Sequence, residues 1–326
     1  MGTSILVTGA TGLVGANVCR LSVQQGHEVR ALVRPGSDAK ALQDLGVEIV
    51  PGDVTDFDSV RDAAKGVELV IHMAALLAGA APELEPHFLA NWVGSQNTFD
   101  AARAVGARRT VWAVSPVLFD LSVTLTEESK IPLPGIETAY AITKRMVYLD
   151  ALRRVESGQD INFVCPGGTY GPSPLVERAM ARASFNSHLR RAIAGEVTKW
   201  VDWQCVYSFV DDVAEVILRA GSRGGTGKLY LALGREEDVC PYPIGLSRVC
   251  ELAGSPNRVQ SVSPFDVPEG REAEFGGINM VQGAKRGAPT PFFDASATRK
   301  ELDFEFTPFD DGVLRTIAWF REHGII

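Results

Sequence analysis

Residues 4–16 read SILVTGATGLVGA: an apolar strand runs into a glycine-rich turn, and the turn runs into a helix. Glycines stand at positions 9, 12 and 15, and each position has its own steric reason for lacking a Cβ. The first permits a tight turn, the second lets the backbone approach a pyrophosphate, and the third lets the helix pack on the strand. The free N–H groups at the start of the helix then face that anion. The stretch predicts a dinucleotide-binding turn, with cofactor contacts at Gly9, Thr11, Gly12, Leu13, Val14 and Gly15.

The alternation of strands and helices continues through the first half of the chain. Further apolar runs rich in Val and Ile predict strands at 28–33, 47–50, 69–72, 110–114 and 161–165. Helical patterns fall between the strands, at 16–25, 59–65, 86–105 and 138–156. Buried strands that alternate with helices are typical of βαβ units. We therefore expect an α/β fold with a Rossmann-type, doubly wound parallel sheet.

The rhythm breaks after Pro166, where prolines become frequent and the expected elements become short. A helix at 211–220 and a strand at 228–233 still resemble the first half, and a last amphipathic helix covers 310–323. We predict a dinucleotide-binding domain over residues 1–166, to which the segment 207–233 returns. Residues 167–326 are expected to form mainly a smaller, interleaved substrate-binding lobe.

Composition and charge exclude several classes of protein. The chain has 326 residues, of which 45% are hydrophobic and 22% are charged, so a disordered protein and a coiled coil are excluded. The 40 acidic and 32 basic residues give a net charge of −8, which disfavours binding to nucleic acid or to an anionic membrane. The five cysteines are scattered without a CxxC pair, so no disulfide framework or metal site is expected. The first strand begins without a leader, which predicts a cytoplasmic protein.

The end of the second expected strand distinguishes NADP from NAD. NAD sites usually carry a carboxylate there, which accepts a hydrogen bond from the 2′-hydroxyl of the adenosine ribose. This chain reads ALVRPGS over 31–37, with Arg34 and Ser37 and no acidic residue. A guanidinium pairs with a 2′-phosphate through charge-assisted hydrogen bonds, although a solvated surface charge is the alternative. We therefore expect NADP(H) rather than NAD(H), held by Arg34 and Ser37.

Tyr140 and Lys144 form the candidate proton-transfer pair. Their spacing of four residues puts them on one face of the expected helix 138–156. A phenol titrates near 10 in water, and a nearby ammonium and a positively charged nicotinamide would each favour the phenolate and lower its pKa. Tyr140 would then donate a proton to a carbonyl oxygen, or remove one from an alcohol. We also expect Lys144 to hydrogen-bond the nicotinamide ribose.

These motifs resemble those of the extended short-chain dehydrogenase/reductase superfamily, whose members carry T-G-x-x-G-x-x-G at the turn. Relatives carry T-S-S or S-S-S where this chain has residues 113–115, so the resemblance implies that Ser115 binds the substrate oxygen. It implies a supporting role near the nicotinamide for Asn91, in an N-x-x-G-x-x-N motif, although a polar bridge between helix and loop is the alternative. The further cofactor contacts that it implies are Asp53, Val54, Ala74, Ala75, Pro166, Gly167 and Thr169.

Two differences separate this chain from the sugar-modifying branches of the superfamily. Nucleotide-sugar dehydratases carry Asp-Glu directly after the active-site hydroxyl, whereas Pro116 and Val117 follow it here. Nucleotide-sugar epimerases usually carry an asparagine just after the sixth strand, whereas this chain has Gly167. The stretch 29–35 instead resembles dihydroflavonol-reductase-like members. An apolar pocket, suited to an aromatic or alicyclic carbonyl compound, is expected from Leu76, Leu77, Val117, Leu118, Tyr170, Trp200 and Trp203.

We predict an NADPH-dependent reductase or dehydrogenase that interconverts a hydrophobic ketone or aldehyde and its alcohol. Two alternatives stay open: a nucleotide-sugar epimerase that retains NAD(P), and a non-catalytic NADP(H) sensor. In the first alternative a diphosphate would be bound by four arginines, which otherwise form a solvated basic face: Arg178, Arg182, Arg190 and Arg191. The resemblance also implies a homodimer.

Overall fold

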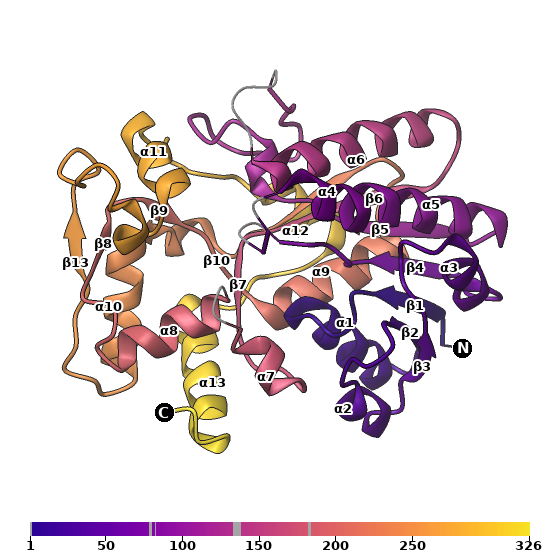
Figure 1. Ribbon diagram of the computed structural model, residues 1–326, viewed down its shortest axis with the longest axis horizontal. Helices are drawn as coiled ribbons and strands as arrows, with labels where there is room; N and C mark the ends of the chain where they lie inside the picture. The colour runs from indigo at the N-terminus through magenta and orange to yellow at the C-terminus, as the bar shows by residue number, and fades with distance from the viewer. Residues whose placement is uncertain (1, 78–79, 82, 133–137, 182–183) are drawn as a thin grey trace.

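A central sheet of parallel strands organises the computed structural model, which describes residues 2–77, 80–81, 83–132, 138–181 and 184–326 (Figure 1). Within this part of the chain seven strands pair in the order β11-β6-β5-β4-β1-β2-β3. Their bounds are β1 Ser4–Thr8, β2 Glu28–Val33, β3 Glu48–Pro51, β4 Leu69–His72, β5 Arg109–Ala113, β6 Ile161–Pro166 and β11 Leu229–Ala232. Strand order reverses at β1, because β2 and β4 pair with its opposite edges. The expected Rossmann-type α/β fold is confirmed.

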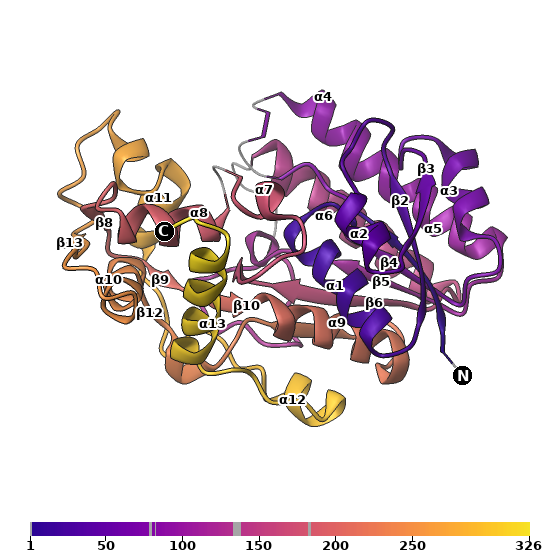
Figure 2. The same ribbon diagram turned by 90° about the horizontal axis from the view of Figure 1, so that it is seen from below.

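Helices cover both faces of this sheet (Figures 1 and 2). The helices α1 and α9 pack together on one face, while α3 packs against α5 and α4 packs against α6. The bounds of these and one further helix are α1 Leu13–Gln24, α2 Lys40–Asp44, α3 Phe57–Ala64, α4 Leu84–His87, α5 Gly94–Ala104, α6 Ala139–Glu156 and α9 Val210–Arg223. The expected helix 86–105 is therefore divided, since the π-helical segment η1, Phe88–Val93, lies between α4 and α5.

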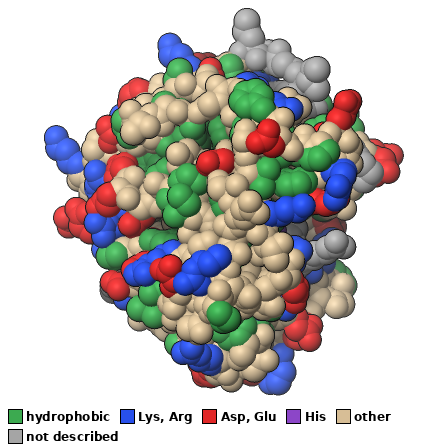
Figure 3. Space-filling model, turned by 90° about the vertical axis from the view of Figure 1, so that its left-hand side faces the viewer, with side chains coloured by type: hydrophobic (Ala, Val, Ile, Leu, Met, Phe, Trp, Pro, Cys, Tyr) green, Lys and Arg blue, Asp and Glu red, His purple; other side chains and the backbone are tan. Residues whose placement is uncertain are grey.

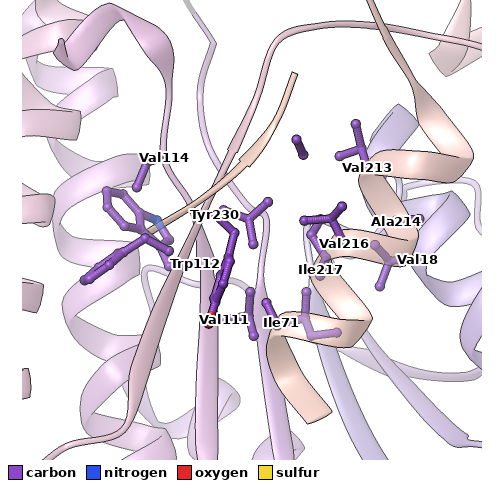
Figure 4. Close-up of a cluster of buried hydrophobic side chains, with 14 of the residues drawn as sticks. Val18, Ile71, Val111, Trp112, Val114, Val213, Ala214, Val216, Ile217 and Tyr230 are labelled. Atoms are coloured by element: carbon purple, nitrogen blue, oxygen red, sulfur yellow. The ribbon is translucent and has the colours of Figure 1, made fainter. Parts of the chain in front are cut away.

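The core of the sheet domain consists mainly of aliphatic side chains. Figure 4 shows valines and isoleucines of β4, β5 and α9 packed around the rings of Trp112 and Tyr230. The central strands are buried on both faces, as is typical of a parallel sheet that helices cover on both sides. Because the strands are parallel, their carboxyl ends, where the glycine turn and Ser115 follow, lie at one edge of the sheet.

The C-terminal lobe is made of short elements around a second core. Its helices are α7 Val176–Ala179, α8 Phe185–Ile193, α10 Tyr242–Leu252, α11 Ile278–Arg286 and α13 Phe309–Glu322. Its strands form two-residue and three-residue pairs: β7 Gly168–Tyr170, β8 Lys199–Val201, β9 Gln204–Cys205, β10 Tyr207–Phe209, β12 Cys240–Pro241 and β13 Gln260–Val262. Three short 3-10 turns complete the elements: η2 Pro116–Leu118, η3 Glu236–Asp238 and η4 Glu272–Phe275. Acidic and basic side chains are interspersed over the face of this lobe in Figure 3.

Two segments of the second half lie in the sheet domain. The segment of α9 and β11 packs on the sheet and adds its edge strand beside β6. A second return involves α12, Ser296–Leu302, since Phe293 and Leu302 are buried in the sheet core. The packing of residues 292–302 on the sheet domain was not predicted from the sequence, because these residues carry no regular strand or helix pattern of sufficient length. None of the helices of the described residues is both long and apolar enough to cross a membrane.

Candidate active site

The glycine turn connects β1 to α1 and gives each glycine a distinct environment. Gly9 has a φ of +69°, and a Cβ on Gly15 would lie 2.2 Å from the Gly9 carbonyl oxygen. The folded chain itself therefore requires glycine at both positions. Gly12 is different: it has extended backbone, and the nearest atom to a Cβ there would be the Gly9 oxygen at 3.4 Å. Gly12 caps α1 without a side-chain hydrogen bond. An open approach to helix N–H groups fits a pyrophosphate, so the turn fits a dinucleotide.

A buried hydrogen-bond network holds this turn against β4. The Thr8 hydroxyl lies 2.6 Å from Nδ1 of His72, and Nε2 of His72 lies 2.9 Å from the Ser95 hydroxyl. Burial and, to a smaller extent, the charge of Lys144 together lower the pKa of His72 to about 3, so the ring is neutral. The Ala74 N–H donates to the same Thr8 hydroxyl at 3.4 Å. The network thereby fixes Ala74, one of the small residues expected at the cofactor, beside Gly9.

Arg34 and Ser37 lie just after the end of β2. This strand pairs with β1 on the edge opposite to β4. Arg34 is exposed, and among the described residues it forms no ion pair. The Ser37 N–H donates to the Arg34 carbonyl at 3.1 Å, which closes a turn beside the guanidinium. After β3, one carboxylate oxygen of Asp53 accepts from both the N–H and the hydroxyl of Thr55 at 2.9 Å. The Val54 carbonyl accepts from Asn97 at 2.9 Å, which orients the Asp53–Val54 turn.

Ser115, Tyr140 and Lys144 come together at the carboxyl ends of β5 and β6. Thr138 caps α6, since its hydroxyl accepts from the Ala141 N–H at 3.2 Å, and α6 then carries Tyr140 in its first turn. The Ser115 hydroxyl lies beside the Tyr140 phenol and opposes a rise in the pKa of that phenol. Lys144 is buried one turn further on, where its Nζ donates to the Ala113 carbonyl at 2.8 Å. The structure therefore assembles the three side chains that the sequence analysis grouped.

The electrostatics of Tyr140 differ from the expectation. Burial raises the pKa of Tyr140, and the hydrogen bond with Ser115 only opposes that rise. The expected lowering by Lys144 is absent because that ammonium is directed at Ala113 and lies 6.0 Å from the centre of the Tyr140 ring. Burial also lowers the pKa of Lys144 to about 7, so its charge is partial at neutral pH. The expected lowering of the phenol pKa by Lys144 was therefore wrong, while the expected lowering by a bound nicotinamide stays a prediction.

Asn91 bridges helix and loop with both ends of its amide. Its oxygen accepts from the Leu76 N–H at 2.7 Å, and its NH₂ donates to the Leu76 carbonyl at 3.1 Å and to the Thr143 hydroxyl at 3.1 Å. The side chain is buried, and these three bonds use both amide hydrogens and one of the two acceptor positions of the oxygen. The structure therefore favours the bridging alternative for Asn91 over direct contact with reacting atoms.

The stretch after β6 crosses from the sheet domain into the C-terminal lobe. Pro166 is the last residue of β6, and the Gly167 N–H donates to the Ser208 hydroxyl at 3.1 Å. The Thr169 hydroxyl donates to the Gly167 carbonyl at 3.2 Å. All three residues are half-buried at the edge that carries Tyr140. The contact of these three residues with a cofactor, which the resemblance implies, stays a prediction.

Three residues expected in the substrate pocket lie in hydrophobic cores instead. Tyr170 is 1% exposed, and its hydroxyl donates to the Phe309 carbonyl at 3.3 Å. Trp200 is 7% exposed and stacks on Tyr242 with ring centres 5.0 Å apart. Leu118 is 1% exposed in the core of the sheet domain. These expectations were wrong because an apolar residue near a strand end can turn toward the interior as readily as toward a cleft.

The other expected pocket residues retain access to solvent. Leu77 is 60% exposed and Val117 is 44% exposed, and both follow strands whose carboxyl ends form the site. Leu76 and Trp203 are half-buried, and Trp203 packs edge-on against Phe292. These four side chains remain candidates for the wall of a pocket.

The basic face of α7 and α8 lies apart from the proton-transfer residues. A hollow of about 580 Å³ is lined there by Val176, Glu177, Met180, Ser187, Arg190, Arg191 and Ile325. Arg190 forms two hydrogen bonds of 2.7 Å with Glu196, which also lies 3.6 Å from Arg191. The pairing favours the solvated basic face over a diphosphate site, while Arg182 lies outside the described residues.

Comparison with known proteins agrees with this geometry. The model of the NAD dependent epimerase/dehydratase family matches residues 5–232, which include the glycine turn, Ser115, Tyr140 and Lys144. The chain belongs to this family. It is accordingly an NAD(P)-dependent oxidoreductase of the extended short-chain dehydrogenase/reductase type.

Members of the family with similar sequences include reductases over their full length. Sterol demethylase protein B of Methylococcus capsulatus is 29% identical over 98% of this chain and 99% of its own. A putative dihydroflavonol 4-reductase of Synechocystis is 28% identical over 100% of this chain and 97% of its own. Among solved structures, gox2253 superimposes with a TM-score of 0.82 at 26% identity, covering 99% of both chains.

Proposed function

We propose that the protein is an NADPH-dependent reductase or dehydrogenase that interconverts a hydrophobic ketone or aldehyde and its alcohol. The observation that carries the proposal is the position of the Ser115 hydroxyl beside the Tyr140 phenol, with the buried Lys144 one helical turn away. Burying the amine of Lys144 destabilises the fold. A protein that only senses NADP(H) needs no such amine beside a phenol, so the arrangement favours an enzyme over a sensor.

The chain supplies two hydrogen-bond donors to the carbonyl oxygen. Ser115 holds this oxygen and stabilises the negative charge that develops on it, while Tyr140 gives it the proton. NADPH, when bound, supplies the hydride for the carbonyl carbon. Lys144 lies behind the phenol and favours return of a proton to the site, since a pKa of about 7 lets it exchange protons at neutral pH. In the reverse direction Tyr140 removes the proton of the alcohol.

The preference for NADP rests on Arg34. Its guanidinium is exposed at the end of β2 and has no carboxylate partner among the described residues. The β2 end itself presents no acidic side chain to a ribose hydroxyl. A 2′-phosphate would give the guanidinium a partner in charge-assisted hydrogen bonds, with Ser37 beside it.

The substrate class rests on the apolar side chains that follow β4 and β5. Leu77 and Val117 expose apolar surface beside Tyr140 and Ser115, and binding a hydrophobic substrate would cover that surface. Two of the full-length relatives are named sterol demethylase protein B and putative dihydroflavonol 4-reductase, names that concern alicyclic or aromatic compounds, whereas two others are named dTDP-4-dehydro-6-deoxy-D-allose reductase. We extend the alicyclic or aromatic class of substrate to the present chain as part of the proposal.

The deciding experiment is a panel of alicyclic and aromatic ketones and aldehydes, screened by NADPH absorbance, with UDP-sugars as the control. Turnover of a hydrophobic carbonyl compound with loss of NADPH supports the proposal. Conversion of a UDP-sugar without net change in NADPH would replace it with the epimerase alternative, which the family description includes.

We also propose a homodimer in the cytoplasm. Exposed apolar side chains gather on the outer surface of α4, η1 and α6, at Leu84, Leu89 and Leu149. Burial of such a surface against a second copy would remove it from water. Sedimentation at micromolar concentration tests the dimer, and a monomer would overturn it.

A further inference from the structure

A buried histidine, to which the sequence analysis gave no role, lies beside the proton-transfer pair. His87 ends α4 and is 1% exposed. Its ring meets the Tyr140 ring edge-on, with centres 6.3 Å apart and an angle of 67° between the planes. The helices α4 and α6, which carry the two rings, lie side by side in Figure 1. The imidazole is therefore part of the wall around the phenol.

One hydrogen bond fixes the tautomer of this histidine. Nε2 of His87 lies 3.0 Å from the carbonyl oxygen of Ala81, which belongs to the chain between β4 and α4. A carbonyl oxygen only accepts, so Nε2 carries the proton and Nδ1 of the neutral ring is a bare acceptor. Nδ1 is buried and has no hydrogen-bond partner among the residues that the structure describes.

The unpaired nitrogen shows that packing does not explain the choice of histidine. A buried acceptor without a partner costs free energy that an apolar side chain of the same shape avoids. Phenylalanine would fill the same space against Tyr140 without this cost. Only the Nε2–H bond to Ala81 distinguishes the imidazole from a phenyl ring here. A glutamine could supply that N–H, but it would not supply the ring.

The neighbouring Asn91 makes a parallel bridge four residues further along. Asn91 joins Leu76 to Thr143 of α6, as His87 joins Ala81 to the Tyr140 ring of α6. The π-helical segment η1 connects the two bridges. Such segments are rare and occur frequently at functional sites.

We infer that His87 is a positioning residue for Tyr140, which holds the phenol through its ring while its Nε2–H ties the chain after β4 to α4. The inference rests on the proposed function, because it relates the positioning of the phenol by His87 to proton transfer by Tyr140. Both parts of the side chain are required, so a residue that retains only one of them does not replace it.

Two variants separate the two parts. His87→Phe keeps a ring and removes the donor, whereas His87→Gln keeps an N–H donor and removes the ring. Each variant is expected to lower kcat about tenfold, a change equal in free energy to one pKa unit of the phenol. The affinity for NADPH and the KM should stay within about twofold of wild type. His87→Phe should retain or raise the melting temperature, because it removes the unpaired nitrogen. A kcat within twofold of wild type in either variant overturns the inference. His323→Gln, at the distant end of α13, is the matched control.

A chemical measurement tests the inference without any substrate. Tetranitromethane nitrates accessible phenolates, and peptide mass analysis gives the rate at each tyrosine separately. His87→Gln removes the ring from the wall around Tyr140 and should raise its nitration rate about tenfold, since burial disfavours the phenolate, whereas His87→Phe keeps a ring there and should raise the rate less. Tyr148, buried on the same helix, should keep its rate and reports any general loss of structure. An unchanged rate at Tyr140 overturns the inference. Absence of carbonyl turnover in the wild type would overturn the proposed function alone, and nitration would still decide the role of His87.

Discussion

The two hydrophobic cores of the protein are built from different side chains. In the sheet domain the core is mainly valine, isoleucine, leucine and alanine from parallel strands and their helices. In the C-terminal lobe it is rich in aromatic rings, among which Tyr207 contacts Tyr170, Tyr242 and Phe309. Branched aliphatic residues suit strands whose register is fixed, whereas large rings fill the space between short, irregular elements.

The buried polar groups of the two regions differ in the same way. In the sheet domain His72, Asn91 and Lys144 hold the turn after β1, the chain after β4 and the end of β5 beside Tyr140. In the lobe the hydroxyls of Tyr170 and Tyr207 bind backbone carbonyls of the lobe itself. Substitutions of buried polar residues in the sheet domain are therefore expected to change catalytic activity, whereas those in the core of the lobe are expected to change the free energy of unfolding.

The strongest test of this comparison is Tyr140→Phe. Loss of the proton donor should lower kcat by about 10²–10⁴-fold, while NADPH affinity stays within about twofold. Steady-state kinetics and fluorescence titration with NADPH measure the two effects. Tyr148→Phe, on the same helix, is the control and should keep most of its activity. Activity near that of wild type in Tyr140→Phe would contradict the assignment of proton transfer to this residue of the sheet domain.

Lys144 predicts a pH dependence of stability that belongs to the sheet domain. Burial lowers its pKa from 10.5 to about 7, so between these values the unfolded chain binds a proton that the folded chain lacks. Stability therefore rises with pH in this window, by about 1.4 kcal/mol per pH unit. Relative to Lys144→Met, the wild type should gain about 2 kcal/mol in the free energy of unfolding between pH 7.5 and 9, measured with urea. Lys300→Met, at an exposed lysine, should show no such gain, and a flat difference for Lys144→Met would contradict the prediction.

Arg34 sharpens the comparison at the cofactor end of the sheet domain. Arg34→Ala should weaken NADPH binding about 10–100-fold, because hydrogen bonds to charged groups contribute about 1.5–3 kcal/mol each. The affinity for NADH should change less than about twofold, since NADH lacks the 2′-phosphate. Arg61→Ala, at an exposed arginine of α3, serves as the control. Equal losses for both cofactors would contradict the assignment.

The smallest effect is expected in the aromatic core. Tyr170→Phe removes the hydrogen bond to the Phe309 carbonyl and should lower the free energy of unfolding by about 1 kcal/mol. KM and kcat should not change, because the ring does not face the site. Thermal unfolding and steady-state kinetics on one preparation measure both quantities. A KM altered severalfold at unchanged stability would instead return Tyr170 to the substrate pocket.

The features predicted correctly from the sequence are those that depend on neighbours along the chain. The strands of the sheet, the glycine turn and the spacing of Tyr140 and Lys144 all follow from local pattern. The break in the helix at η1 was missed because π-helical hydrogen bonding has no residue signature in this stretch. His87 was missed for a related reason. A single histidine on a helix shows its function only when its ring neighbour and its carbonyl partner, which come from other segments, are known.

The sequence by itself determined the family, the parallel sheet and the three side chains that carry the proposed proton transfer. It could do so because steric demands at a turn and periodicity in a strand are written in consecutive residues. Only the tertiary structure decided that Tyr170 and Trp200 turn inward, that Asn91 bridges the chain after β4 and the helix α6, and that burial raises the pKa of Tyr140. Those outcomes depend on desolvation and on partners distant in the chain, and no local pattern encodes how much water is removed from a group.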